Sequence, residues 1–390
     1  MPLRAAADAG AGDPDLALVF VSHHHAGLMG AVGDVVHRRL RPGAMLAVSA
    51  EAVLGGSREL EGRAGISILA GRFPGGAVST FTSEDLPVPD EDDDANGEAF
   101  AKALGADDQT RAIIFFADPF SVPMVKLLPA LSAMCTKTLG MKRAPIIGGM
   151  ASAGAGPGTN GIIIHKRLSR TGAGGVVIRG DVTVDTVVSQ GCKPFGPPYV
   201  VTGAKHNVLL SLSGRTAMQA LQEAIETLGG ADRAQLEKGV FLGRVINEYK
   251  DRFGRGDFLI RNVVGVDQNR GALAVADMLR VGQTVQFHIR DAVTADEDLR
   301  LLLAAQRLRE PAAGALLVTC NARGTRIFSE PDHDASIISS ELTPEGGAPP
   351  PLAGFFGAGE IGPIGAESFL HGHTACLALF RSKDAGLPED

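Results

Sequence analysis

Short apolar runs recur along this chain. Examples are LALVFVS (16–22), AMLAVSAE (44–51), AIIFFAD (112–118) and GALLVTC (314–320). Runs of this length predict buried β-strands, and none approaches the roughly 18 apolar residues that a membrane-spanning helix needs. Segments with helical spacing of apolar residues, such as 28–40, alternate with them. The sequence predicts a mixed α/β (α+β) fold of two related halves, each a mixed β-sheet flanked by helices, with a four-layer α-β-β-α stacking as the expected arrangement.

Charge and cysteine content exclude several classes of partner. The 37 Lys and Arg residues are outnumbered by 44 Asp and Glu, which gives a net charge of −7 and no basic surface for a nucleic acid. The four cysteines are far apart and form no CxxC pair, which argues against a zinc ribbon or a disulfide framework. The N-terminal sequence carries aspartates where a signal peptide needs an unbroken apolar core. We therefore expect a cytoplasmic protein with reduced thiols, no nucleic-acid partner and no membrane insertion.

A segment rich in glycine and proline suggests where the chain divides. GCKPFGPPYVVTGAKHN (191–207) has the turn-forming composition of a join between domains. We place flexible ends at 1–14 and 383–390, an N-terminal domain at 15–204 and a C-terminal domain at 205–382.

Two distant stretches share one pattern. Residues 44–71 and 353–380 each contain an apolar strand, a lone glutamate (Glu51 or Glu360), a glycine turn and a closing apolar strand. Residues 145–166 form a looser third copy that lacks the glutamate. The pattern predicts related modules whose strand-end loops gather around a shared crevice, a preferred place for a small-molecule site.

Several motifs resemble the FIST domain in its N-terminal and C-terminal parts, over roughly residues 15–382. They are SAEAVLGGSRELE, GCKPFGP, INEYKDRFGRGDFLIRNVVGVD, VGQTVQFHIRDAVTADEDLR and, most specifically, GFFGAGEIGPIGAESFLHGHTACLALF. The resemblance implies a sensory module for signal transduction that binds a small ligand, for which amino acids have been proposed in this family. It also implies an unknown downstream signalling protein, and we expect a stand-alone sensory protein.

Carboxylates and arginines near strand ends are the main candidates for ligand contacts. Glu51 and Glu360 follow apolar strands in glycine-rich turns, so each could bind an amine or could instead cap its own loop. Arg323 in the loop NARGTR could clamp a carboxylate, with Asn321 beside it. Arg261 and an Arg290–Asp pair could grip a zwitterion, or could form structural ion pairs between strands.

Histidines follow two of the predicted strands. His371 alternates with a second histidine in FLHGHTA, and His23 follows Ser22 in the run SHHH. Hydrogen bonding to backbone is favoured over a metal site, because a metal needs further ligands that only folding could bring close. We expect no metal, cofactor or catalytic residue. The candidate ligand-binding residues are Glu360, Glu51, Arg323, Asn321, Ser22, His23, Arg261, Arg290 and His371.

Two other functions stay open at this point. A hydrolase or transferase could use Glu360, His371 or Cys320, although Cys320 also fits a buried free thiol. A scaffold that binds another protein is the third possibility. The ligand and the oligomeric state are not readable from the residues.

Overall fold

The computed structural model describes residues 13–89, 93–138 and 144–382. The chain forms two compact units: a larger unit of Met1–Val188, Arg300–Leu370 and Thr374–Asp390, and a smaller unit of Ser189–Leu299 and His371–His373. The boundary predicted at 204/205 falls inside the smaller unit, at the end of the long strand β13 (Cys192–Lys205). The predicted domain boundary therefore does not coincide with a boundary between the compact units. The division into an N-terminal and a C-terminal domain stays a prediction.

Three modules of the same construction build most of the larger unit. Each has a strand, a helix, a second strand parallel to the first, a hairpin and a closing antiparallel strand. The first module consists of β1 (Leu16–Ser22), α1 (Met29–Leu40), β2 (Ala44–Ala50), β3 (Val53–Gly55), β4 (Arg58–Leu60) and β5 (Ile66–Gly71). The second consists of β7 (Thr110–Ala117), α3 (Met124–Ala133), β8 (Ile146–Met150), β9 (Ile162–Ile164), β10 (Arg167–Ser169) and β11 (Ala173–Gly180). The third consists of β20 (Gly314–Cys320), α7 (His333–Glu341), β21 (Leu352–Gly357), β22 (Glu360–Ile364), β23 (Glu367–His371) and β24 (Thr374–Ser382).

Strand pairing is the same in each module. The first strand lies between its parallel partner and its antiparallel partner, in the orders β2-β1-β5, β8-β7-β11 and β21-β20-β24. The internal similarity predicted from the sequence is therefore present in the fold, including its looser third copy.

Each hairpin pairs with another module and not with its own. β3 pairs with β21 of the third module, β22 pairs with β8 of the second, and β9 pairs with β2 of the first. The three exchanges close a cycle, so no module can complete its sheet alone. β6 (Gly76–Thr82) and β12 (Val182–Gln190) extend two of these sheets beside β11 and β24.

The sequence pattern predicted that Glu51 and Glu360 occupy equivalent positions in two modules. The strand register shows that they do not. Both precede the first glycine of a hairpin turn (Gly56 and Gly365) by the same number of residues. The hairpin of the third module is longer, however, so Glu360 is the first residue of β22 and pairs with Gly149 inside the sheet. Glu51 lies in the loop before β3, and the two glutamates therefore have different surroundings.

Phenylalanines from all three modules form the centre of the core. The ring of Phe20 lies 5.9 Å from that of Phe116 and 5.5 Å from that of Phe355, and the last two rings are 5.3 Å apart. All three side chains are buried. Burial of such large apolar surfaces is the main force that holds the modules together.

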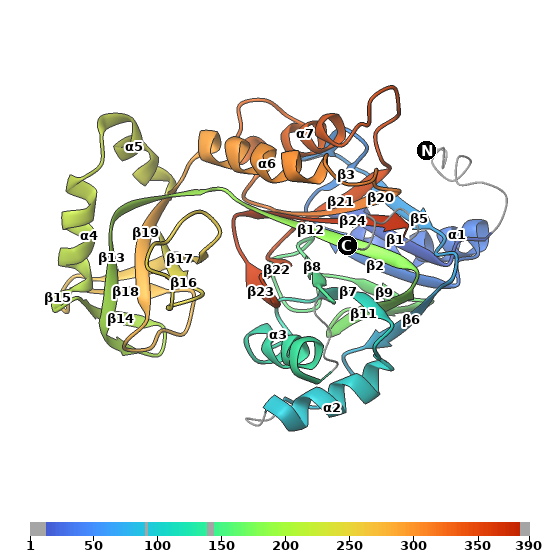
Figure 1. Ribbon diagram of the computed structural model, residues 1–390, viewed down its shortest axis with the longest axis horizontal. Helices are drawn as coiled ribbons and strands as arrows, with labels where there is room; N and C mark the ends of the chain where they lie inside the picture. The colour runs from blue at the N-terminus through green and yellow to red at the C-terminus, as the bar shows by residue number, and fades with distance from the viewer. Residues whose placement is uncertain (1–12, 90–92, 139–143, 383–390) are drawn as a thin grey trace, which may run out of the picture. The chain divides into compact units, whose positions relative to one another are not determined.

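Helices cover the outer faces of the sheets in the larger unit (Figure 1). α1 packs its buried Met29 and Val36 on the outer face of β1 and β2. α2 (Asp93–Leu104) and α3 cover β7 and β8, while α7 and the C-terminal half of α6 (Ala292–Gln306) lie over β20 and β21. The predicted mixed α/β class is confirmed, and the larger unit contains three mixed sheets. The four-layer stacking stays a prediction.

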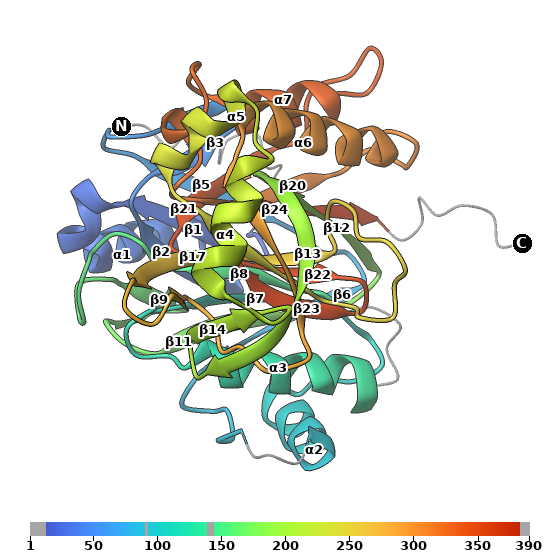
Figure 2. The same ribbon diagram turned by 90° about the vertical axis from the view of Figure 1, so that its left-hand side faces the viewer.

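The smaller unit is one antiparallel sheet with a helix on one face. Figure 2 shows α4 (Ala217–Glu226) against this sheet, where its buried face meets the cluster around Leu273 and Phe287. α5 (Gly230–Ala234) follows α4. The strands in spatial order are β13, β19 (Thr284–Arg290), β16 (Phe241–Val245), β17 (Phe258–Asp267), β18 (Ala272–Val275), β14 (Val208–Leu212) and β15 (Arg215–Thr216). The long strand β13 also pairs with β14, so the sheet closes on itself.

Candidate functional site

The strand-end loops of the three modules are joined at one hydroxyl group. The backbone N–H of Glu51, in the first module, donates to Ser152 Oγ in the second module over 2.8 Å. Ser152 Oγ in turn donates to the carbonyl oxygen of Phe356 in the third. The strand-end loops that the sequence predicted to lie close together are therefore in contact. Ser152, which joins them, was not among the predicted site residues.

An exposed ion pair lies beside this junction. Arg326, in the 3₁₀ turn Gly324–Arg326, places Nη2 2.5 Å from Glu51 Oε1, and the two side chains are 53% and 35% exposed. Arg326 Nη1 also donates to the carbonyl oxygen of Asn321, and His23 Nδ1 donates to the carbonyl oxygen of Glu51 over 2.8 Å. The structure thus brings Glu51, Asn321 and His23 together and adds Arg326.

Ser22 lies buried next to the loop that carries His23. It is fully buried at the end of β1, and its Oγ accepts the N–H of Gly65 over 2.9 Å. Its hydroxyl links β1 to the start of β5 and holds the loop that carries His23.

Arg323 is buried beneath these loops. Its Nε and Nη2 donate to the two carboxylate oxygens of Asp334 over 2.8 and 2.9 Å, and both side chains are 1% exposed. Thr319 Oγ1 also donates to Asp334. Burial alone would raise the pKa of Asp334, but the Arg323 guanidinium and the hydrogen bond from His333 hold this pKa well below its usual range. Arg323 is therefore a buried cation with one carboxylate partner.

Glu59 places a second carboxyl group next to this pair. Its Oε1 accepts the N–H of Ala335 over 3.0 Å, and its own N–H donates to Asp332 Oδ1. Burial, together with repulsion from Asp334, raises the pKa of Glu59 to about 8. The hairpin of the first module is thereby attached to the first turn of α7 in the third.

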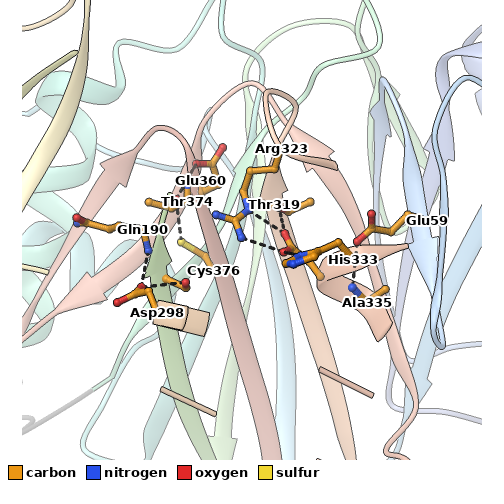
Figure 3. A network of polar contacts seen from close by, with 12 residues as sticks. Glu59, Gln190, Asp298, Thr319, Arg323, His333, Ala335, Glu360, Thr374 and Cys376 are labelled. Carbon is orange, nitrogen blue, oxygen red and sulfur yellow. Dashed lines mark hydrogen bonds and ion pairs between the residues drawn. The ribbon is translucent and has the colours of Figure 1, made fainter. Parts of the chain in front are cut away.

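Glu360 is fully buried on the other side of Arg323. Figure 3 shows Arg323 between His333 on one side and Glu360 and Thr374 on the other. Glu360 Oε2 accepts the N–H and the hydroxyl of Thr374 over 3.1 and 2.7 Å. Burial raises the pKa of Glu360 to about 8, although the hydrogen bonds from Thr374 and Cys320 and the charge of Arg323 all lower it. At neutral pH this side chain is held mainly as the neutral acid.

The remaining predicted residues lie in the smaller unit. Arg261 Nε donates to Asp277 Oδ2 over 3.3 Å, and this carboxylate also binds Arg244, which fits the structural ion pair considered above. Arg290 ends β19, and His371 is buried at the end of β23. These three residues therefore belong to a different compact unit from the other predicted residues.

Sequence reasoning missed Arg326, Ser152, Asp334 and Glu59. Arg326 was within reach, because it shares the loop NARGTR with Arg323 and both are arginines near a strand end. No pattern in this loop shows which arginine turns inward. Asp334 and Glu59 are far from Arg323 in sequence, so only the fold reveals that they surround it.

We expect Ser152→Ala to lower the free energy of unfolding by about 1–2 kcal/mol, because the Glu51 N–H loses its acceptor and the Phe356 carbonyl loses a donor. Urea denaturation checks this. Ser340→Ala, which removes a hydroxyl that contacts only its own helix, is the control and should have a smaller effect. Equal effects of the two variants would show that Ser152 does not join the loops.

Neither a metal cluster nor a membrane helix is found in the parts of the chain that the structure describes. No group of three or more His, Cys, Asp and Glu side chains there is arranged to hold a metal ion. No helix within those same ranges is both long enough and apolar enough to cross a membrane.

Comparison with known proteins gives one family. The FIST N domain matches residues 15–215 and the FIST C domain matches residues 217–363. An uncharacterized protein of Mycobacterium tuberculosis is 36% identical over 388 residues, which cover 97% of this chain and 96% of the relative. An uncharacterized protein of Mycobacterium bovis is 36% identical over 370 residues, which cover 94% and 90%. FIST domains are generally sensory domains of signal transduction. The chain, matched along most of its length by both domains, belongs to the FIST family.

Proposed function

We propose that this protein is a ligand-binding sensor whose ligand is a small zwitterion such as an amino acid, bound at the strand-end loops of the larger unit. One observation carries the proposal: the exposed Glu51–Arg326 pair presents a carboxylate and a guanidinium side by side. A zwitterion has the complementary pair of charges. The sensory role of FIST domains supports a small ligand but does not specify it.

Opening the Glu51–Arg326 pair costs little, because exposed ion pairs contribute only about 0–1 kcal/mol. The ligand carboxylate then accepts two hydrogen bonds from the planar Arg326 guanidinium, and the ligand ammonium donates to Glu51. One ion pair is thus replaced by two, and the loops supply the rest of the contact surface.

Neighbouring residues hold this pair in place. His23 and Ser152 bond the backbone of Glu51, and the Asn321 carbonyl holds Arg326 Nη1. Ligand binding at this point would act on all three modules through Ser152, which offers a route from ligand to a downstream signalling protein. We propose Ser22, Arg323 and Glu360 as buried supports of the site and not as direct ligand contacts.

Calorimetric titration with a panel of amino acids tests the proposal. The best binder is then compared with two analogues, one that lacks the ammonium group and one that lacks the carboxylate. We expect both analogues, and both Glu51→Gln and Arg326→Gln, to weaken binding at least about tenfold, the loss of about 1.4 kcal/mol expected when one charged contact is removed.

Glu84→Gln is the matched control, because Glu84 forms an exposed pair with Arg167 elsewhere in the same unit. It should leave affinity unchanged. If no amino acid binds, or if Glu51→Gln and Arg326→Gln bind as the unchanged protein does, the zwitterion site is wrong, even though the chain remains a FIST protein.

A further inference from the structure

A cavity of about 260 Å³ opens at the opposite ends of the strands from the loops described above. It lies between the first and third modules, where β1 and β20 begin and β5 and β24 end. Its lining consists of Leu16, Leu18, Leu69, Ala70, Gly71, Arg72, Phe73, Ala313, Gly314, Pro351 and Phe380.

The strand register explains why this place is hollow. Gly71 pairs with Leu16, and the positions that correspond to Gly71 in the other modules are Ile178, paired with Ala112, and Phe380, paired with Gly314. Ile178 and Phe380 carry large side chains that fill the core at their positions. A Cβ atom built on Gly71 would meet no atom within 4 Å. At this position the first module has a glycine where the other two modules have a large apolar side chain, and the space stays unfilled.

The chemistry of the lining selects a class of occupant. The side chains are aliphatic or aromatic except at Arg72, which is the one charged residue among the described residues that line the cavity. Arg72 is exposed, and its Nε donates to the carbonyl oxygen of Asp13 over 3.3 Å, so the guanidinium lies near the mouth. An apolar body would gain from burial against the leucines and phenylalanines, and an anionic end would remain at the mouth beside the cation.

We propose that this cavity binds a small apolar carboxylic acid, of the size of a single aromatic ring or a short alkyl chain. A dry cavity of about 150 Å³ is known to hold a benzene ring, so a volume of this size suits such a molecule. The carboxylate lies at Arg72, and the ring or chain lies over Gly71 and Gly314. This site uses none of the residues of the proposed zwitterion site, so either can fail without the other.

Calorimetric titration of the full chain with benzoate and hexanoate, and with the neutral benzyl alcohol and 1-hexanol, tests the proposal. We expect the acids to bind at least tenfold more tightly than the alcohols. Arg72→Gln should remove this preference, while Gly71→Ile should abolish binding of the acids and raise the Tm of the free protein, because the new side chain fills the hollow as Ile178 does in the second module.

Gly230→Ile is the matched control, since Gly230 also has open space at its Cβ position but begins α5 in the smaller unit. It should leave acid binding unchanged. If Gly71→Ile does not fold, Gly314→Ala replaces it. Its added methyl group narrows the same cavity and makes only ordinary contacts, with Leu69 Cδ1 at 3.6 Å and the carbonyl oxygen of Pro351 at 3.8 Å. The proposal is overturned if neither acid binds, if the alcohols bind as tightly as the acids, or if the filled variant still binds them.

Discussion

Asp334→Ala is expected to lower the free energy of unfolding by about 3–5 kcal/mol, the usual cost of removing one partner from a buried ion pair. Arg323 and Asp334 are both 1% exposed, and two parallel hydrogen bonds connect them. Without the carboxylate, the guanidinium stays in the interior with no anion of comparable geometry. Glu59 is close enough to interact with it, but its carboxyl group accepts the N–H of Ala335 and forms no such pair of hydrogen bonds with the guanidinium. Urea denaturation followed by circular dichroism measures the loss.

A second variant separates the lost charge from the lost volume. Replacing both partners, Arg323→Met with Asp334→Leu, leaves no buried charge and should recover much of the stability, as apolar replacements of buried ion pairs often do. Glu84→Ala removes one partner of an exposed pair and should cost less than about 1 kcal/mol. If Asp334→Ala costs no more than Glu84→Ala, the Arg323–Asp334 pair does not stabilise the larger unit.

The local parts of the fold were predictable from the sequence, and the exchange of hairpins was not. Runs such as 16–22 and 314–320 are almost entirely apolar because these strands are buried on both faces, so their pattern identifies them. The similarity of 44–71 and 353–380 likewise reflects the same order of strands. Nothing local, however, specifies that β3 pairs with β21 or that β22 pairs with β8, because these partners are hundreds of residues apart or belong to another module.

The candidate site shows the same division. Residues that follow a strand, such as Glu51, Asn321 and His23, could be placed at a common edge, because parallel strands end together. The burial of Arg323 and the exposure of Arg326 depend on which way a short 3₁₀ turn faces, and three residues of spacing do not decide this. Glu360 was matched to Glu51 because each has the same distance to its turn, but the longer hairpin of the third module draws Glu360 into the sheet.

Glu360→Gln should change how stability depends on pH. The pKa of Glu360 is about 8 in the folded chain against 4.5 for the free group, so the folded state holds a proton that the unfolded state releases. Stability from this group is therefore fully present below pH 4.5 and falls as the pH rises towards 8. By linkage the loss has an upper limit of about 5 kcal/mol, at about 1.4 kcal/mol for each pH unit.

The expected result is that Glu360→Gln gains stability relative to the unchanged protein as the pH rises from 5 to 9. Glutamine keeps the oxygen that accepts from Thr374 but cannot ionise. Glu59 also has a raised pKa and titrates in the same direction, but it is present in both proteins, so its contribution cancels in the difference between them. Urea denaturation at several pH values measures this difference, with Glu84→Gln as a control whose profile should stay parallel to that of the unchanged protein. A constant difference between Glu360→Gln and the unchanged protein across this range would mean that Glu360 is ionised in the folded state. The buried carboxyl would then be a second anion for Arg323, and the guanidinium would be shared between Asp334 and Glu360.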